Sequence, residues 1–182
     1  DPNGIMVEDQ GSFARVLPRG VAFDGTSFLI PWWWSRVNPP WDEKIQAVRV
    51  SPDGAVLRPP TTISQGGSAP DARRTPAVAF GQTSYLVAWY DRRTGGEDVY
   101  GARVTSGGVL DPSGIPIAAG PDLEWYPAVA FGADQFLVVN DQHPSIVEHR
   151  VALGVGRPGS QDAVHRLGRL LDRDERFGLV AS

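Results

Sequence analysis

The chain has 182 residues and carries 17 basic and 21 acidic side chains, so its net charge is a mild −4 with both signs interspersed along the sequence. This balance excludes the strongly basic surface that phosphate recognition requires, and nucleic acid is not expected as a partner. Cysteine is absent, which excludes disulfides and thiolate metal sites, and no apolar run approaches the roughly 20 residues of a membrane-spanning helix.

The first predicted elements follow a short opening block. Residues 1–7 read Asp-Pro-Asn-Gly-Ile-Met-Val and have a counterpart at 111–117, Asp-Pro-Ser-Gly-Ile-Pro-Ile. From residue 20 the chain reads Gly-Val-Ala-Phe, then a polar Asp-Gly-Thr-Ser turn, then a second apolar strand over 27–34. A third strand ends with Ala-Val-Arg-Val at 47–50 and runs into a Ser-Pro-Asp-Gly turn. Short apolar runs joined by such turns predict antiparallel hairpins.

The same blocks then recur in the same order. Residues 77–87 and 128–138 align with 20–30, and Phe23, Phe80 and Phe131 stand at the matching position, at intervals of 57 and 51 residues. We expect each of these rings to be buried in its own unit. The second unit continues with a strand at 84–90, a polar loop at 91–97, a third strand at 98–104 and a short fourth strand near 114–118.

Four antiparallel strands in a repeat of about fifty residues is typical of a β-propeller blade. The sequence therefore predicts an all-β fold, namely repeated four-stranded antiparallel blades that form a partial β-propeller of about three blades. The units cover about 20–75, 76–126 and 127–152, and the last is completed by 1–18. Since propellers typically close with about four to eight blades, we expect either further blades in a longer chain or self-association with a second copy.

The C-terminal segment 153–182 departs from the repeat. Gly-Val-Gly-Arg-Pro-Gly at 154–159 matches a dinucleotide-binding fingerprint, and the leucine spacing over 161–173 is compatible with a helix. A nucleotide-binding fold also needs a second strand with an acidic residue, for which too few residues remain. We interpret 153–182 as a divergent terminal segment, helical or poorly ordered.

Residues 76–117 carry a resemblance to known repeats. The motifs Pro-Ala-Val-Ala-Phe-Gly, Tyr-Leu-Val-Ala-Trp, Asp-Val-Tyr-Gly-Ala-Arg-Val and Leu-Asp-Pro-Ser-Gly-Ile-Pro-Ile resemble repeats in secreted or surface proteins of bacteria, notably myxobacteria. The resemblance covers residues 1 to about 140. It implies a propeller-like fold and an extracellular or cell-surface location, and it brings no catalytic motif. The first unit departs from the pattern with three consecutive tryptophans and a Pro-rich loop.

Those tryptophans are the first candidate binding residues. Strand alternation places Trp33 on the face opposite Trp32 and Trp34, so the three indoles do not share one core. Exposed indoles beside the Pro-rich loop, at Trp33, Trp34 and Trp41, suit stacking on a sugar ring or a partner protein. The competing interpretation is that these side chains pack between adjacent blades.

The polar loop of the second unit supplies the other candidates, Asp91 and Arg92, which could bind a small ion. The competing interpretation is that Asp91, Arg92, Arg93 and Asp98 hydrogen-bond the loop to its surroundings. The three histidines stand in no metal-binding or catalytic motif. We therefore expect no catalytic residue, no metal site and no cofactor.

Two functions remain open at this point. The preferred one is a non-catalytic extracellular binding or scaffold module of a bacterial surface or secreted protein, with a glycan or a protein as ligand. The alternative is the propeller portion of a secreted carbohydrate-active hydrolase, which needs two paired carboxylates. Loop acids could supply such a pair, namely Asp42, Glu43, Asp91, Glu97, Asp122 and Glu124.

Overall fold

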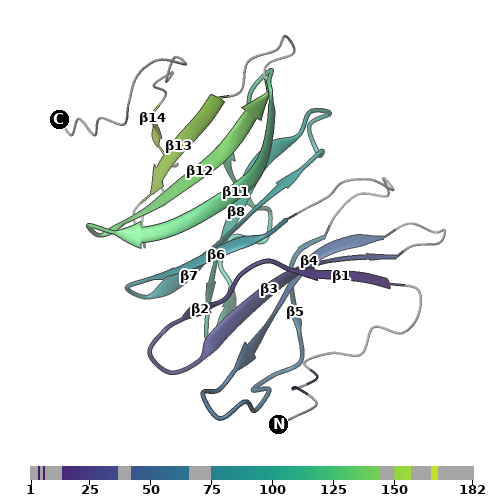
Figure 1. Ribbon diagram of the computed structural model, residues 1–182, viewed down its shortest axis with the longest axis vertical. Coiled ribbons are helices and arrows are strands. Elements are labelled where there is room, and N and C mark those ends of the chain that lie inside the picture. The colour runs from purple at the N-terminus through teal and green to yellow at the C-terminus, as the bar shows by residue number, and fades with distance from the viewer. Residues whose placement is uncertain are drawn as a thin grey trace.

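The computed structural model describes residues 14–36, 42–65, 75–143, 150–156 and 165–167, together with Gly4 and Met6. Within these ranges every regular element is a β-strand, and the strands form three antiparallel sheets (Figure 1). The all-β fold predicted from the sequence is thereby confirmed for this part of the chain. None of the described segments is a helix long and apolar enough to cross a membrane.

The first sheet has the strand order β1-β3-β4-β5, and β2 also pairs with β3. Its strands are β1 (Ala14–Pro18), β2 (Ala22–Phe23), β3 (Phe28–Arg36), β4 (Glu43–Val50) and β5 (Thr61–Gln65). The hairpin between β2 and β3 turns over Asp24–Ser27 and bends at Gly25 and Thr26, where Gly25 has a φ of 93°. Glycine adopts that left-handed conformation without the steric penalty that a side chain would add.

The second and third sheets follow the same meander. The second has the order β10-β8-β7-β6 with β9 beside β8, and the third has the order β11-β12-β13-β14. Their strands are β6 (Ala77–Gly81), β7 (Ser84–Asp91), β8 (Asp98–Thr105), β9 (Gly108–Val109), β10 (Ile115–Ala118), β11 (Leu123–Gly132), β12 (Gln135–His143), β13 (Arg150–Gly156) and β14 (His165–Leu167).

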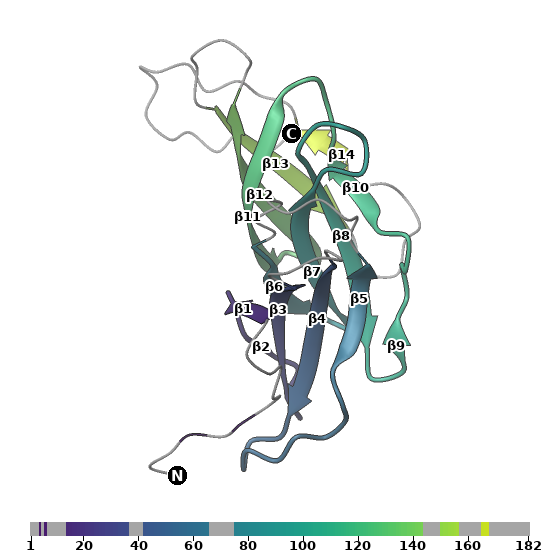
Figure 2. The same ribbon diagram turned by 90° about the vertical axis from the view of Figure 1, so that its right-hand side faces the viewer.

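The three sheets stack face to face in chain order (Figures 1 and 2), and two hydrophobic clusters fill the spaces between them. In the first cluster, Leu29 and Trp33 of the first sheet pack with Val87 and Trp89 of the second. The second cluster joins the opposite face of the second sheet to the third sheet. Strand β7 is buried along its whole length, which explains why its sequence is almost continuously apolar instead of alternating.

The aligned phenylalanines lie near the hairpin ends, each paired with an aromatic ring across its hairpin. The ring centroids are 4.7 Å apart in Phe23–Phe28, 5.0 Å in Phe80–Tyr85 and 5.0 Å in Phe131–Phe136. The expected burial is wrong for Phe23, which is 44% exposed, and only partly right for the half-buried Phe80 and Phe131. Phe80 and Phe131 pack against the sheet that precedes theirs. Phe23 has no described sheet before its own to cover it.

Two short segments pair in ways that the sequence did not predict. Within the segment 1–18, expected to complete the third unit, residues 14–18 form β1 and pair with β3 of the first sheet. Residues 1–13 lie outside the described part apart from Gly4 and Met6, so their role in the third unit stays a prediction. In the tail, 165–167 form a strand instead of a helix, because the free edge of β13 offers them a hydrogen-bonding partner. Residues 157–164 and 168–182 lie outside the described ranges.

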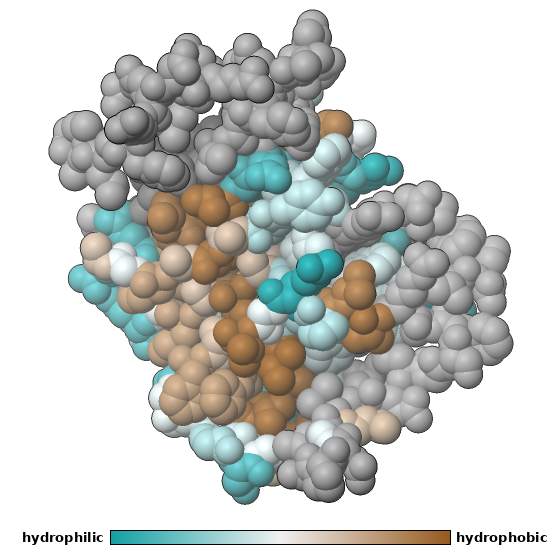
Figure 3. All heavy atoms as spheres, in the orientation of Figure 1, coloured by the Kyte–Doolittle hydropathy of each residue, from teal (hydrophilic) through white to brown (hydrophobic). Residues whose placement is uncertain are grey.

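Hydrophobic side chains also reach the surface of the described part. Figure 3 shows hydrophobic residues gathered along the face on which β2, β6 and β11 lie. Val21 and Phe23 are among the exposed large hydrophobic residues of the described chain. On this face the β2–β3 hairpin contacts β6, and β6 contacts β11 of the third sheet.

Candidate functional site

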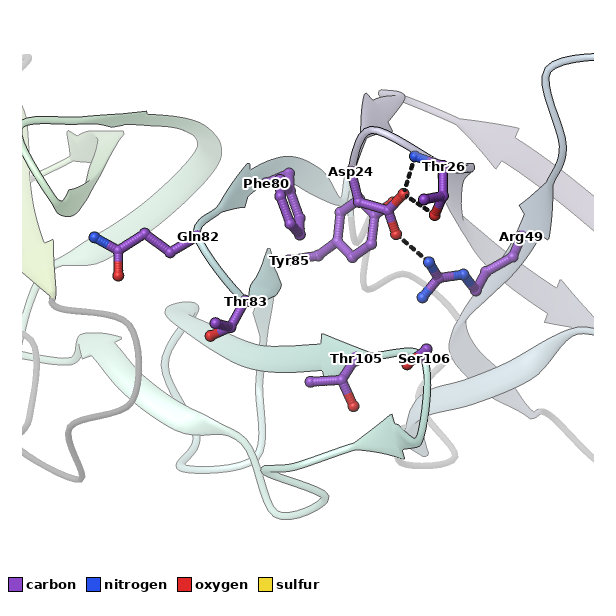
Figure 4. Close-up of a pocket in the computed structure, with 9 residues that line it drawn as sticks. All are labelled: Asp24, Thr26, Arg49, Phe80, Gln82, Thr83, Tyr85, Thr105 and Ser106. Carbon is purple, nitrogen blue, oxygen red and sulfur yellow. Dashed lines mark hydrogen bonds and ion pairs between the residues drawn. The ribbon is translucent and has the colours of Figure 1, made fainter.

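A cavity of about 200 Å³ opens between the hairpin ends of the first and second sheets (Figure 4). It is surrounded by turns and strand ends of both sheets, so its shape depends on how the two sheets stack. The lining residues are Asp24, Thr26, Arg49, Phe80, Gln82, Thr83, Tyr85, Thr105 and Ser106.

The β2–β3 turn positions the acidic side chain of this cavity. One carboxylate oxygen of Asp24, Oδ1, accepts hydrogen bonds from the backbone N–H of Thr26 at 2.8 Å and of Ser27 at 2.7 Å. The hydroxyl of Thr26 donates to the same oxygen at 2.7 Å. Aspartate commonly bonds the backbone two residues ahead in turns. The local sequence Asp-Gly-Thr-Ser therefore holds the carboxylate in place before any ligand arrives.

The other carboxylate oxygen, Oδ2, pairs with the guanidinium of Arg49 from β4. Arg49 also donates to the hydroxyl of Ser27, at 2.8 Å from Nη2 and 3.1 Å from Nε. Burial by itself would raise the pKa of Asp24, but hydrogen bonds from Thr26 and from the Ser27 backbone outweigh burial and hold the pKa well below its usual range. Asp24 is therefore an ionised, paired carboxylate at neutral pH and is unsuited to donating a proton.

Tyr85 joins the two sheets beneath the cavity. Its buried hydroxyl donates a 2.8 Å hydrogen bond to the backbone carbonyl of Ser27, and the guanidinium carbon of Arg49 lies 5.4 Å from its ring centroid. Burial and then the negative charge of Asp24 raise the pKa of Tyr85 to about 12. The phenol is thus neutral at physiological pH, and it acts as a fixed hydrogen-bonding link between the sheets.

The aligned place between the second and third sheets is built differently. Gly81 stands there at the position that Asp24 occupies in the first sheet, and the ring of Phe131 packs directly onto it. A Cβ atom on Gly81 would lie only 2.2 Å from Cδ2 of Phe131. Phe80 aligns with Phe131 but faces a hairpin that carries the Asp24 side chain. The replacement of glycine by Asp24 therefore distinguishes the cavity-forming interface from the filled one.

A second cavity, a groove of about 380 Å³, runs along the edges of the three sheets at which β2, β6 and β11 lie. It is lined by the segments 19–21, 75–78 and 126–129; the first precedes β2, the second leads into β6 and the third lies within β11. Tyr126 lies at its side, half exposed, with a positive φ of 49°. None of the residues that line this groove carries a carboxylate.

The structure places Trp33 and Trp34 of the predicted tryptophan site on opposite faces of the first sheet. Trp33 is only 5% exposed and packs in the core between the first and second sheets. This position matches the competing interpretation, in which the tryptophans pack between adjacent sheets. Trp34 points to the opposite face and is half-buried, with the ammonium nitrogen of Lys44 at 4.6 Å from its ring centroid. Trp41 lies outside the described residues. A binding role for Trp34 and Trp41 stays a prediction.

The predicted pair Asp91 and Arg92 lies at the far end of β7 from the cavity. Asp91 is buried, accepts a 3.0 Å hydrogen bond from the indole of Trp89 and pairs with Arg93 at 2.5 Å. Burial would raise the pKa of Asp91, yet the hydrogen bonds from Arg93 and Trp89 lower it. Arg92 pairs with Glu97 at 2.6 Å. These contacts match the competing interpretation in which the loop is bonded to its surroundings.

The residues of the inter-sheet cavity were missed from the sequence, although one signal was present. Asp24 stands where the two aligned hairpins carry Gly81 and Gly132, so a departure from the repeat marked the place. Arg49 aligns with Arg103, which pairs instead with Asp111 at 2.8 Å, and only the folded arrangement within each sheet shows which partner each arginine takes. In the described ranges, no group of three or more His, Asp or Glu side chains is arranged to hold a metal ion.

No protein-family model and no curated protein sequence matches this chain. Solved structures resemble it in fold. A thermostable family-43 glycoside hydrolase has a TM-score of 0.57 at 13% identity, over 97% of this chain and 64% of the other. A neuraminidase-like protein from A/bat/Guatemala/164/2009 has a TM-score of 0.51 at 14% identity, over 86% of this chain and 43% of the other. The chain therefore spans less than two thirds of either structure, and the likeness concerns the fold alone.

Proposed function

We propose that this chain is part of a β-propeller, contributing about three blades, and that it acts as a non-catalytic binding or scaffold module. Three stacked antiparallel sheets with matching sequence blocks support the propeller assignment, as does the fold likeness to two larger proteins. The resemblance of residues 76–117 to bacterial surface repeats supports an extracellular or cell-surface location, with a glycan or a protein as ligand.

The observation that carries the non-catalytic assignment is the carboxylate content of the two cavities. Glycoside hydrolysis by the usual mechanism needs two carboxyl groups about 5–9.5 Å apart, one of them with a raised pKa so that it can donate a proton. Asp24 is the one carboxylate that lines either cavity, and its pKa is lowered by its hydrogen bonds. The described cavities therefore favour binding over hydrolysis.

The second candidate is the propeller portion of a secreted carbohydrate-active hydrolase. Its support is the fold shared with the family-43 glycoside hydrolase, of which this chain covers 64%. On this hypothesis the paired carboxylates stand on blades or loops other than those that line the two described cavities.

A glycan array probed with the labelled chain, run beside a panel of chromogenic glycosides, separates the two functions. The proposal expects saturable binding with no turnover above the buffer control. Turnover that rises with protein concentration and persists through further purification would replace it with the hydrolase alternative.

The partner proposal concerns blade number. Three blades are fewer than the roughly four to eight that close a propeller, so we propose that this segment joins further blades or pairs with a second copy. Size-exclusion chromatography with light scattering tests the pairing. A monomer with a high melting temperature would contradict an open three-blade arrangement.

A further inference from the structure

We propose that the inter-sheet cavity binds a single residue of a neutral saccharide. This inference rests on the proposed binding function, and it names the ligand class and the side chains that contact it. The cavity volume of about 200 Å³ lies below the roughly 300–1,000 Å³ of sites for drug-sized ligands. It is therefore matched to one sugar ring with its chain continuing into solvent, and not to an enclosed oligosaccharide.

The charge of the cavity argues for a neutral ligand. Asp24 and Arg49 are the charged groups among the lining residues, and they form a pair in which both side chains are largely buried, at 11% and 15% exposure. An anionic ligand would have to compete with Asp24 for the guanidinium, and a cation would have to compete with Arg49 for the carboxylate. Either competition would leave a buried charged side chain without its ion-pair partner, which is energetically unfavourable. A ligand that brings hydroxyl groups avoids that cost.

The hydrogen-bonding groups that remain around the cavity fit hydroxyls. In the described structure, Nη1 of Arg49 and the hydroxyls of Thr83 and Ser106 line the cavity without a hydrogen bond of their own, while Thr26 donates its hydroxyl proton to Asp24 and keeps its acceptor lone pairs. The cavity thus offers donors and acceptors side by side. A sugar hydroxyl is both a donor and an acceptor, so each such group finds a counterpart.

An aromatic ring supplies the apolar contact. Phe80 is half-buried, lines the cavity and stands beside Tyr85 in edge-to-face contact (Figure 4). A sugar ring presents apolar C–H groups on one face and hydroxyls around its rim. Phe80 can cover that apolar face while the polar rim meets Arg49 and the hydroxyls, because burying the C–H groups against the ring removes apolar surface from water.

The chain contains its own control for this assignment. Phe131 aligns with Phe80, pairs with Phe136 at the same 5.0 Å centroid separation and is likewise half-buried. Its ring, however, packs on Gly81 and does not line the inter-sheet cavity. Loss of either ring removes a similar aromatic contact, but only the loss of Phe80 removes a wall of the cavity.

The experiment titrates the chain with neutral methyl glycosides (glucoside, galactoside, mannoside, xyloside and N-acetylglucosaminide) and with glucuronate and N-acetylneuraminate, followed by saturation-transfer NMR and calorimetry. We expect at least one neutral glycoside to bind saturably. Phe80→Ala should weaken that binding at least about tenfold, and Phe131→Ala should leave it within about twofold. Ser106→Trp, at an exposed turn, should block the cavity and weaken binding by a similar factor without removing a core side chain.

Circular dichroism verifies that each variant is folded. If Phe80→Ala does not fold, Ser106→Trp alone tests whether the cavity binds the glycoside. The inference is overturned if only the acidic sugars bind, if no neutral glycoside binds, or if Ser106→Trp binds as tightly as the unmodified chain. Array binding that survives Ser106→Trp would overturn this ligand site and leave the binding function standing. Glycoside turnover would overturn the binding function itself.

Discussion

Replacing Gly81 with alanine tests how the second and third sheets are packed. The added Cβ would lie 2.2 Å from Cδ2, 2.4 Å from Cε2 and 2.7 Å from Cγ of the Phe131 ring. Carbon atoms rest about 3.5–4.0 Å apart, so the ring would have to retreat by roughly 1.3 Å or more. Its edge-to-face contact with Phe136 and its place against the second core cluster resist that movement. Overpacking of this kind costs about 1–3 kcal/mol.

Urea unfolding measures the loss, and thermal melting should show it as roughly 2–4 °C for each kcal/mol in a chain of this size. Gly132→Ala is the matched control, because Gly132 ends the aligned strand of the third sheet and a Cβ there meets nothing within 4 Å. Neither glycine has a positive φ, so backbone strain does not contribute. The control should change the free energy of unfolding by less than about 0.5 kcal/mol.

A double-mutant cycle identifies the source of the cost. In a Phe131→Ala background, Gly81→Ala should lose most of its effect, giving an interaction energy within the roughly 0.5–3 kcal/mol seen for residues in contact. The reasoning is refuted if Gly81→Ala is as harmless as Gly132→Ala, or if its cost is unchanged when the ring is absent.

Three further predictions concern the first and second sheets. Because the pKa of folded Asp24 lies below its ordinary value of 3.8, its stabilising contribution is present above about pH 4 and is lost as the pH falls further; urea unfolding at pH 7 and pH 3 should show a smaller pH-dependent loss in Asp24→Asn than in the unmodified chain. Tyr85→Phe should cost about 0.5–1.5 kcal/mol, since it removes the hydrogen bond to the Ser27 carbonyl; an unchanged melting temperature would contradict that link between the sheets. Trp33→Ala should cost about 3–5 kcal/mol and the half-buried Trp34→Ala clearly less; equal losses in thermal melts would contradict the assignment of Trp33 to the core.

The local sequence pattern was sufficient to predict the strands and the face of the sheet on which each tryptophan side chain lies. The Asp-Gly-Thr-Ser turn and the apolar runs around it predicted the β2–β3 hairpin, and alternation predicted that Trp33 would face away from Trp32 and Trp34. The structure confirms both, with Trp33 in one cluster and the other two indoles in another. These features depend on neighbours within a few residues, because hairpin turns and strand pleating are short-range properties of the backbone.

The contacts between sheets were decided only by the tertiary structure. The sequence does not state that 14–18 pair with β3, because the backbone groups of a strand edge accept any strand that reaches them. Nor does it state that Phe23 is left exposed while the aligned Phe80 is half-buried, since that depends on which sheet stands before each ring. The cavity has the same origin. Asp24 is expected from the sequence to be a turn residue. It pairs with Arg49 within the first sheet, and only the stacking of the second sheet beside this pair encloses the cavity that the pair lines.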